Sequence, residues 1–220
     1  MKTNRNLYRV IYTSSYDRGL QHLLEIWPDV KKEVPESELH VFYGWQLFDR
    51  FYHDNPASMK WKDHIEEMMK ADGITHHGRV SQPQIAEEMK QSGIWAYPTH
   101  FGEINCITAL KAQAYGAVPV VIDYAALETT VQFGIKVKGD IYEPAVENSF
   151  KKELIWALQT PDWLEKVRVP MMAWASQHFT WKNIAKQWDQ TFKGDSAAPF
   201  WQIPADSIIK VVNGEEAKNG

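Results

Sequence analysis

One glutamate and the backbone around it carry most of the chemistry that this sequence offers. Between Ile94 and Ile122 the chain reads IWAYPTHFGEINCITALKAQAYGAVPVVI, which predicts a strand, a polar turn, a helix and a second buried strand. Glu103, Ile104 and Asn105 fall where the first strand has ended and the helix begins. Ligands of open α/β sheets bind outside the carboxyl ends of the strands. Free backbone N–H groups at a helix start, beside a carboxylate, suit a sugar phosphate.

Composition excludes several classes of protein. The net charge is −4 with both signs interspersed, which argues against a nucleic-acid-binding surface. A single cysteine, Cys106, excludes an internal disulfide and fits a reducing compartment. The first residues, MKTNRNLYRV, contain no apolar signal region, and no apolar run is long enough to span a membrane. We therefore expect a cytoplasmic protein with no membrane span and no nucleic-acid partner.

Strand and helix signals alternate along the chain. Apolar, β-branched runs predict strands at residues 9–13, 39–43, 74–77, 94–97, 118–122 and, more weakly, 135–137. Helical periodicity separates them, and Ser81 and Thr180 stand where helix N-caps are expected. Such alternation predicts an α/β fold: a single Rossmann-like, doubly wound parallel sheet with helices on both faces and a C-terminal helical appendage. Residues 1–192 are expected to form one domain, and residues 193–220 a polar tail.

Several common motifs are missing. The sequence has no GxGxxG after the first strand, no GxxxxGK[ST] and no GxSxG, which argues against a dinucleotide dehydrogenase, a P-loop NTPase and an α/β-hydrolase. The adjacent His76 and His77 lack partners at metal-binding spacing, so we interpret them as a pair of residues at a strand end whose hydrogen bonds are satisfied within the fold. No Asp-x-Asp stands in a suitable context, so no metal site is predicted.

Tryptophan is abundant, with 10 residues in the chain. Five of them lie on the apolar stripes of predicted helices, which favours core packing over sugar stacking. These are Trp27, Trp61, Trp156, Trp181 and Trp188.

Three segments carry a resemblance to a known family. TSSYDRGL after the first strand, the turn GRV and the segment PTHFGEINCITALKAQAYGAVPVV resemble the C-terminal, donor-binding half of retaining GT-B glycosyltransferases of the group 1 type. The late segment WKNIAKQW is similar to the closing helix of such domains, so the resemblance covers Arg9 to Phe192. It implies that residues 1–192 bind a nucleotide-diphosphate sugar of the UDP or GDP type as substrate, without a further cofactor. The implied reaction is retaining transfer of the sugar to a hydroxyl acceptor.

The first loop of the resemblance implies contacts to phosphate. Arg18 and Gly19 match the family's Lys/Arg-Gly pair, whose cation contacts the donor diphosphate. We expect Arg18 at the start of a helix whose N–H groups also face phosphate, while the alternative is a solvated arginine beside Asp17. Ser14 and Ser15 lie where the family often has a second cation, and their hydroxyls can donate hydrogen bonds but carry no charge.

The second loop implies contacts to the sugar and the diphosphate. Glu103 matches the first glutamate of the family's Glu–seven residues–Glu motif, which holds the hydroxyls of the donor sugar. An acidic residue there also stabilises the helix dipole, which is the simpler alternative. The resemblance assigns the backbone N–H groups of Ile104, Asn105 and Cys106 to the diphosphate. No base stands beside the Cys106 thiol, so we interpret Cys106 as a packed residue and not as a nucleophile.

The nucleotide side of the site departs from the family. Arg79 and Val80 match a loop that borders the base, although a plain strand-to-helix turn is an equal alternative. Lys111 stands where the second motif glutamate binds the ribose, and a lysine cannot accept hydrogen bonds from ribose hydroxyls. We expect Lys111 either to contact a phosphate or to point to solvent.

We also expect this chain to lack the N-terminal half of a GT-B enzyme. Its first strand begins near residue 9, whereas the acceptor side of such enzymes comes from an N-terminal domain. Our first hypothesis is therefore the donor half of a glycosyltransferase, with Arg18 and Glu103 as its catalytic residues. The alternative is a non-catalytic nucleotide-sugar-binding or protein-interaction module that complements a separate acceptor domain. An apolar face left uncovered by the missing half would also favour self-association.

Overall fold

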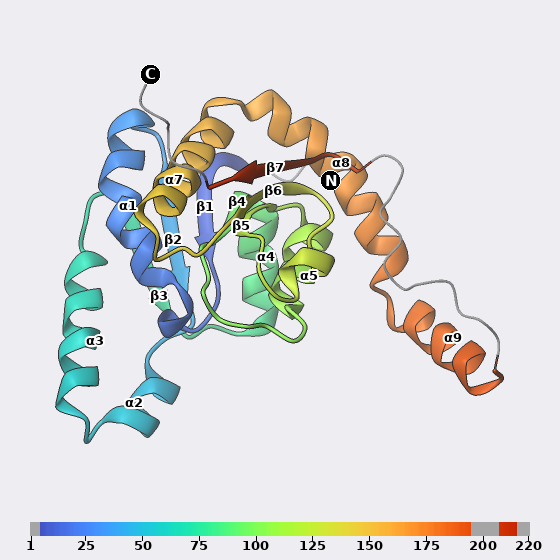
Figure 1. Ribbon diagram of the computed structural model, residues 1–220, viewed down its shortest axis with the longest axis horizontal. Coiled ribbons are helices and arrows are strands. Elements are labelled where there is room, and N and C mark those ends of the chain that lie inside the picture. The colour runs from blue at the N-terminus through green and yellow to red at the C-terminus, as the bar shows by residue number, and fades with distance from the viewer. Residues whose placement is uncertain (1–4, 195–206, 215–220) are drawn as a thin grey trace.

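All strands of the sheet run parallel. The computed structural model describes residues 5–194 and 207–214, and within these residues seven strands follow the order β3-β2-β1-β4-β5-β6-β7 (Figure 1). The strands are β1 (Asn6–Tyr12), β2 (Glu38–Phe42), β3 (Ile74–Gly78), β4 (Ser92–Tyr97), β5 (Val118–Ile122), β6 (Gly134–Lys138) and β7 (Ile209–Asn213). Val10 of β1 lies opposite Leu39 on one side and Ile94 on the other, so β1 and β4 are neighbours. The strand order reverses between them, which is where such sheets bind ligands.

Helices cover both faces of this sheet (Figure 1). On one face lie α1 (Leu20–Glu33) and α7 (Pro144–Gln159), with α3 (Pro56–Met68) beside α1. On the other face lie α4 (Gln82–Gln91), α5 (Ile107–Tyr115) and α8 (Pro161–His178). The shorter or outlying elements are η1 (Tyr16–Arg18), α2 (Gln46–Tyr52), α6 (Leu127–Thr130) and α9 (Trp181–Phe192). The predicted doubly wound α/β fold is confirmed. In the described ranges, no helix combines the length and the apolar content that crossing a membrane requires.

The central strands owe their burial to this two-sided cover. Every residue of β4 and β5 is buried, including Trp95 and Tyr97 on β4. Strands covered on both faces need continuous apolar runs, which is why the sequence predicted these two strands well. Leu20, Leu23 and Trp27 of α1 are fully buried against the same sheet.

The C-terminal segment differs from the prediction. Part of the segment expected to be a polar tail forms β7, which pairs in parallel with β6. An edge strand of this kind is stabilised by backbone hydrogen bonds to a partner about 75 residues away in the chain, as in the pairing of Gly134 with Ile209. Residues 195–206 and 215–220 of the predicted tail lie outside the described residues.

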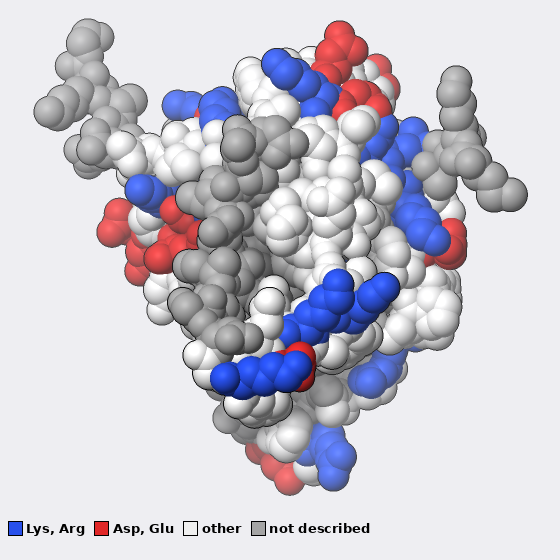
Figure 2. Space-filling model, turned by 90° about the vertical axis from the view of Figure 1, so that its right-hand side faces the viewer, with Lys and Arg blue, Asp and Glu red and all other residues white. Residues whose placement is uncertain are grey.

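The tryptophans divide into two groups. Trp27 is fully buried, and Trp61 and Trp156 pack partly buried against the core, as expected. The prediction of core packing was wrong for Trp181 and Trp188, which are 85% and 62% exposed. Both lie on α9, which follows α8 and projects away from the sheet (Figure 1), and none of the residues of α9 is buried. Figure 2 views the molecule from this side and shows a face made mainly of uncharged side chains.

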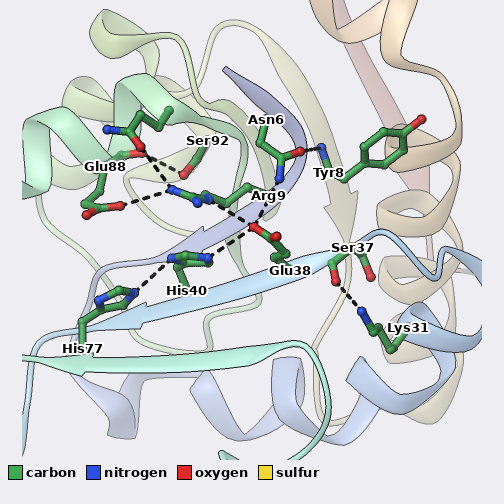
Figure 3. Close-up of polar contacts among 11 residues, drawn as sticks. Asn6, Tyr8, Arg9, Lys31, Ser37, Glu38, His40, His77, Glu88 and Ser92 are labelled. Carbon is green, nitrogen blue, oxygen red and sulfur yellow. Dashed lines mark hydrogen bonds and ion pairs between the residues drawn. The ribbon is translucent and has the colours of Figure 1, made fainter. Parts of the chain in front are cut away.

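A polar network joins the outer strands on one side of β1 (Figure 3). The His77 Nε2 and His40 Nδ1 atoms lie 3.0 Å apart, and His40 Nε2 lies 3.5 Å from Glu38 Oε2. His76 is hydrogen-bonded to the Tyr16 hydroxyl at 2.7 Å. His76 and His77 each have a hydrogen-bond partner in the fold, as interpreted, but the two partners are different residues.

Candidate functional site

The loops after β1 and β4 touch at the point where the strand order reverses. Gly19 makes this contact possible, because its φ is +111° and a Cβ at its position would lie 2.2 Å from the Pro98 carbonyl oxygen. Only glycine fits such a left-handed, close approach. The expectation for Arg18 needs a correction here. Arg18 ends the short turn η1, and Gly19 separates it from α1, so Arg18 does not lie in the first turn of that helix.

Arg18 faces Glu103 across the two loops. Arg18 Nη1 lies 3.3 Å from Glu103 Oε1, and the guanidinium carbon lies 3.8 Å from the centre of the Phe101 ring. The Arg18 side chain is 35% exposed and that of Glu103 is 13% exposed. The cation is therefore held between a carboxylate and an aromatic face while it remains open to solvent. The sequence did not indicate Phe101 as part of the site.

A second contact orients Glu103 from below. The Tyr97 hydroxyl donates to Glu103 Oε1 at 2.9 Å, and the buried Ser14 Oγ lies 3.2 Å from the Tyr97 oxygen. Because Tyr97 gives its only proton to Glu103, Ser14 must donate to Tyr97. Burial raises the pKa of Tyr97 far above its usual range, so this hydroxyl remains a donor. Ser15 acts through its carbonyl, which accepts from the Arg18 N–H at 3.0 Å and closes the turn.

Tyr97 is a site residue that sequence reasoning missed. Its one signal was its place at the end of a buried strand, next to the predicted turn. A buried tyrosine hydroxyl needs a hydrogen-bond partner, and the carboxylate six residues later supplies one here.

The backbone after Glu103 offers free donors. In the part of the chain that the structure describes, no protein group accepts a hydrogen bond from the N–H groups of Ile104, Asn105 and Cys106. Ile104 is 98% exposed, and α5 begins directly after Cys106, at Ile107. Cys106 itself is only 4% exposed, and burial raises the pKa of its thiol to about 12. Such a thiol is inert near neutral pH, which agrees with a packing role.

A cavity of about 490 Å³ lies on the other side of the β1 loop. It is lined by residues from the ends of β1, β2 and β3 and from α4 and α5, among them Thr13, Arg79, Val80 and Lys111. Lys111 Nζ donates to Gln82 Oε1 at 2.6 Å, so its side chain bridges α5 to the start of α4.

The predicted residues therefore form two adjoining groups. Ser14, Arg18 and Glu103 meet where the loops touch, beside the free N–H groups that follow Glu103. Arg79, Val80 and Lys111 surround the cavity of about 490 Å³. Thr13 lines that cavity and precedes Ser14 in the chain, so the loop after β1 contributes to both groups.

Comparison with known proteins places this chain in a family. The profile of the family described as glycosyl transferases group 1 matches residues 2–169. The chain belongs to this family. No curated protein matches this chain by sequence.

Solved structures show the same fold at low identity. The pneumococcal O-GlcNAc transferase GtfA in complex with UDP and GlcNAc aligns with a TM-score of 0.68 and 16% identity, over 88% of this group 1 chain and 37% of GtfA. Sucrose-phosphate synthase from Thermosynechococcus elongatus aligns with a TM-score of 0.67 and 19% identity, over 84% of this chain and 45% of the synthase. Anabaena Alr3699/HepE in complex with UDP and glucose aligns with a TM-score of 0.67 and 14% identity, over 87% of this chain and 49% of HepE. The group 1 chain thus spans less than half the length of each of these structures.

Proposed function

We propose that this chain is the donor half of a glycosyltransferase and binds the diphosphate of a UDP- or GDP-sugar between the loops after β1 and β4. The ion pair of Arg18 with Glu103, next to the free N–H groups of residues 104–106, is the observation that carries the proposal. A guanidinium and several backbone donors are the groups that bind a diphosphate well. Membership of glycosyl transferases group 1, and the UDP in two structures of the same fold, support this choice of ligand.

Glu103 is arranged to hold the sugar. Arg18 and Tyr97 both contact Oε1, and among the described residues no group donates to Oε2. When a diphosphate occupies the guanidinium of Arg18, Glu103 keeps its orientation through Tyr97 and offers Oε2 to a sugar hydroxyl. A carboxylate accepts such bonds strongly because the acceptor is charged.

The same groups would assist the departure of the nucleotide. Negative charge builds on the diphosphate as the bond to the sugar breaks, and Arg18 with the N–H groups before α5 stabilises that charge. Transfer to a hydroxyl acceptor with retention is the reaction proposed for the complete protein. We assign no general base to this half.

Calorimetry with UDP, GDP and their glucose conjugates tests the proposal. The folded chain should bind at least one of these nucleotides, and Arg18→Ala should weaken that binding. Lys152→Ala is a matched control, because it removes the same charge from an exposed position on α7. Failure of all four nucleotides to bind the folded wild-type chain would contradict the proposal.

A second candidate is a nucleotide-sugar-binding module that complements a separate acceptor domain without activity of its own. Lys111 favours it, because a lysine replaces the carboxylate expected to hold the ribose. The exposed aromatic stripe of α9 offers a surface for such a partner. A structure of a GtfA/B complex, which has the same fold at 15% identity, is consistent with this arrangement. Slow hydrolysis of a UDP-sugar by the isolated chain would favour the enzyme, whereas binding without turnover would favour the module.

A further inference from the structure

A cluster of three possible metal ligands lies outside the donor site, between α1 and α7. His22 and Glu25 are one helical turn apart on α1, and Glu147 reaches them from α7. His22 Nδ1 lies 3.5 Å from Glu147 Oε1 and 3.8 Å from Glu25 Oε2, and the three ligand atoms are all within 4.8 Å of one another. The sequence did not indicate this group, because Glu147 is 122 residues beyond Glu25.

The buried nitrogen of His22 points to a missing ligand. His22 is only 7% exposed, and its Nδ1 atom is buried without a hydrogen-bond partner. The two carboxylates face it from distances longer than the 2.7–3.2 Å of an ordinary N–H···O bond. A buried polar atom without a partner is costly, so a group that binds all three atoms at once would relieve the site.

The spacing suits a small tetrahedral cation. Zinc bound to nitrogen and oxygen at about 2.0–2.2 Å places neighbouring ligand atoms about 3.3–3.6 Å apart. The distances of 3.5 Å and 3.8 Å from His22 Nδ1 to the two carboxylate oxygens are close to this range without a bound ion. One imidazole and two carboxylates form a ligand set that Zn²⁺ accepts, with a fourth position left for water.

Neighbouring groups already orient two of the ligands. Gln21 Nε2 donates to Glu25 Oε1 at 2.7 Å, which leaves Oε2 turned to His22. The Tyr142 ring packs edge-on against the His22 ring, with the centres 4.9 Å apart. The lysine that bridges the same helices, Lys151, is paired with Asp29 at 2.6 Å. Outer contacts of this kind hold ligands in place at metal sites.

We propose that His22, Glu25 and Glu147 bind one divalent transition-metal ion, zinc by the chemistry of the ligands, and that this ion clamps α1 to α7. The three residues contact one another and not Arg18 or Glu103, although the His22 ring lies 6.1 Å from the ring of His100 in the loop after β4. The competing explanation is a protonated His22 that pairs with both carboxylates and binds no metal.

Zinc titration of chelator-stripped protein decides between these explanations. Calorimetry should show one Zn²⁺ per chain, and thermal unfolding should show a rise in Tm on adding Zn²⁺ but little on adding Mg²⁺. Loss of an outer partner of a ligand costs about 10–100-fold in metal affinity, so His22→Ala and Glu147→Gln should each lower the zinc affinity by about 100-fold or more. Glu147→Gln keeps the size of a half-exposed side chain, so it stays informative if His22→Ala does not fold.

The control is His53→Ala, which removes an exposed histidine beside Asp54 after α2. It should leave zinc binding and the rise in Tm unchanged. The proposal is overturned if the wild-type chain takes up no zinc, or if Glu147→Gln binds zinc as tightly as the wild type. UDP binding should be the same in Glu147→Gln and the wild type, so this test does not depend on the donor site.

Discussion

Arg18 and Glu103 are 85 residues apart in the chain and form a 3.3 Å ion pair above the carboxyl ends of β1 and β4. Phe101 covers one side of the guanidinium, and Tyr97 fixes the carboxylate from below. The pair therefore presents a cation, a carboxylate and the free N–H groups of the same loop on one partly open surface.

Loss of the Arg18 cation should weaken binding of the diphosphate. A hydrogen bond to a charged group contributes about 1.5–3 kcal/mol, so Arg18→Ala should lower the affinity for UDP by about 10–100-fold. Arg18→Lys should fall between Arg18→Ala and the wild type, because it keeps the charge but loses the planar fork. Calorimetry measures both, and an equal loss of affinity in Lys152→Ala would show that the effect is not local.

Glu103→Gln should separate sugar binding from nucleotide binding. Removing the carboxylate charge should leave the affinity for UDP unchanged or slightly higher, because a negative group beside the diphosphate is lost. The affinity for UDP-glucose relative to UDP should fall by about tenfold, because a charged acceptor of sugar hydroxyls becomes neutral. If that ratio stays at the wild-type value, Glu103 does not hold the sugar.

A Cβ at position 19 should disrupt the meeting of the two loops. Gly19→Ala combines a φ of +111° with a contact of 2.2 Å to the Pro98 carbonyl oxygen, so we expect a loss of at least about 3 kcal/mol in the free energy of unfolding. Gly78→Ala is the matched control, with a φ of +65° and open space at the Cβ, and should cost about 1–2 kcal/mol. Urea unfolding compares the two variants. Equal losses would mean that the loops are not in close contact.

The polar network of β1 to β3 should make stability depend on pH (Figure 3). Burial, followed by the charges of Arg9 and His77, lowers the pKa of His40 from 6.5 to about 4, and Glu38 only partly opposes this shift. In the unfolded chain, His40 therefore binds a proton near pH 6.5, whereas in the folded chain it binds one only near pH 4. The free energy of unfolding should fall as the pH drops through this window.

His40→Gln is the variant that assigns this pH dependence. Urea unfolding between pH 7.5 and pH 4.5 should give a shallower slope for His40→Gln than for the wild type, because the titrating group is gone. Glu88→Gln is the control, because it breaks the 3.4 Å pair of Glu88 with Arg9 and leaves His40 in place. Identical slopes for the wild type and His40→Gln would rule out His40 as the source.

The exposed aromatic side chains of α9 should drive association. Trp181, Trp188 and Phe192 are 85%, 62% and 77% exposed, and an apolar surface of this kind favours contact with another chain. The double variant Trp181→Ser, Trp188→Ser should lower the dimer fraction in sedimentation velocity without lowering the melting temperature. Phe51→Ser is the control, because it removes one aromatic ring that is 71% exposed on α2. A wild-type chain that stays monomeric at high concentration would contradict this prediction.

Features that depend on neighbouring residues agree with the sequence predictions. β5 has the predicted bounds, and β4 begins two residues before its predicted start, because a strand covered on both faces shows a continuous apolar run wherever it lies in the chain. Ser81 accepts a hydrogen bond from the Gln84 N–H at 3.4 Å, and Thr180 accepts one from the Asn183 N–H at 3.3 Å, as expected of N-caps. These features depend on residues within one helical turn or one strand.

The sequence by itself determined the alternation of strands and helices, the turn that carries Glu103 and the loop that carries Arg18. Only the tertiary structure decided that these two residues meet, that Tyr97 supports the carboxylate, that β7 joins the sheet and that Trp181 and Trp188 of α9 are exposed. Each of these depends on which distant segment becomes a neighbour. A stripe of apolar residues predicts a buried face, but burial itself requires a second surface that the stripe does not encode.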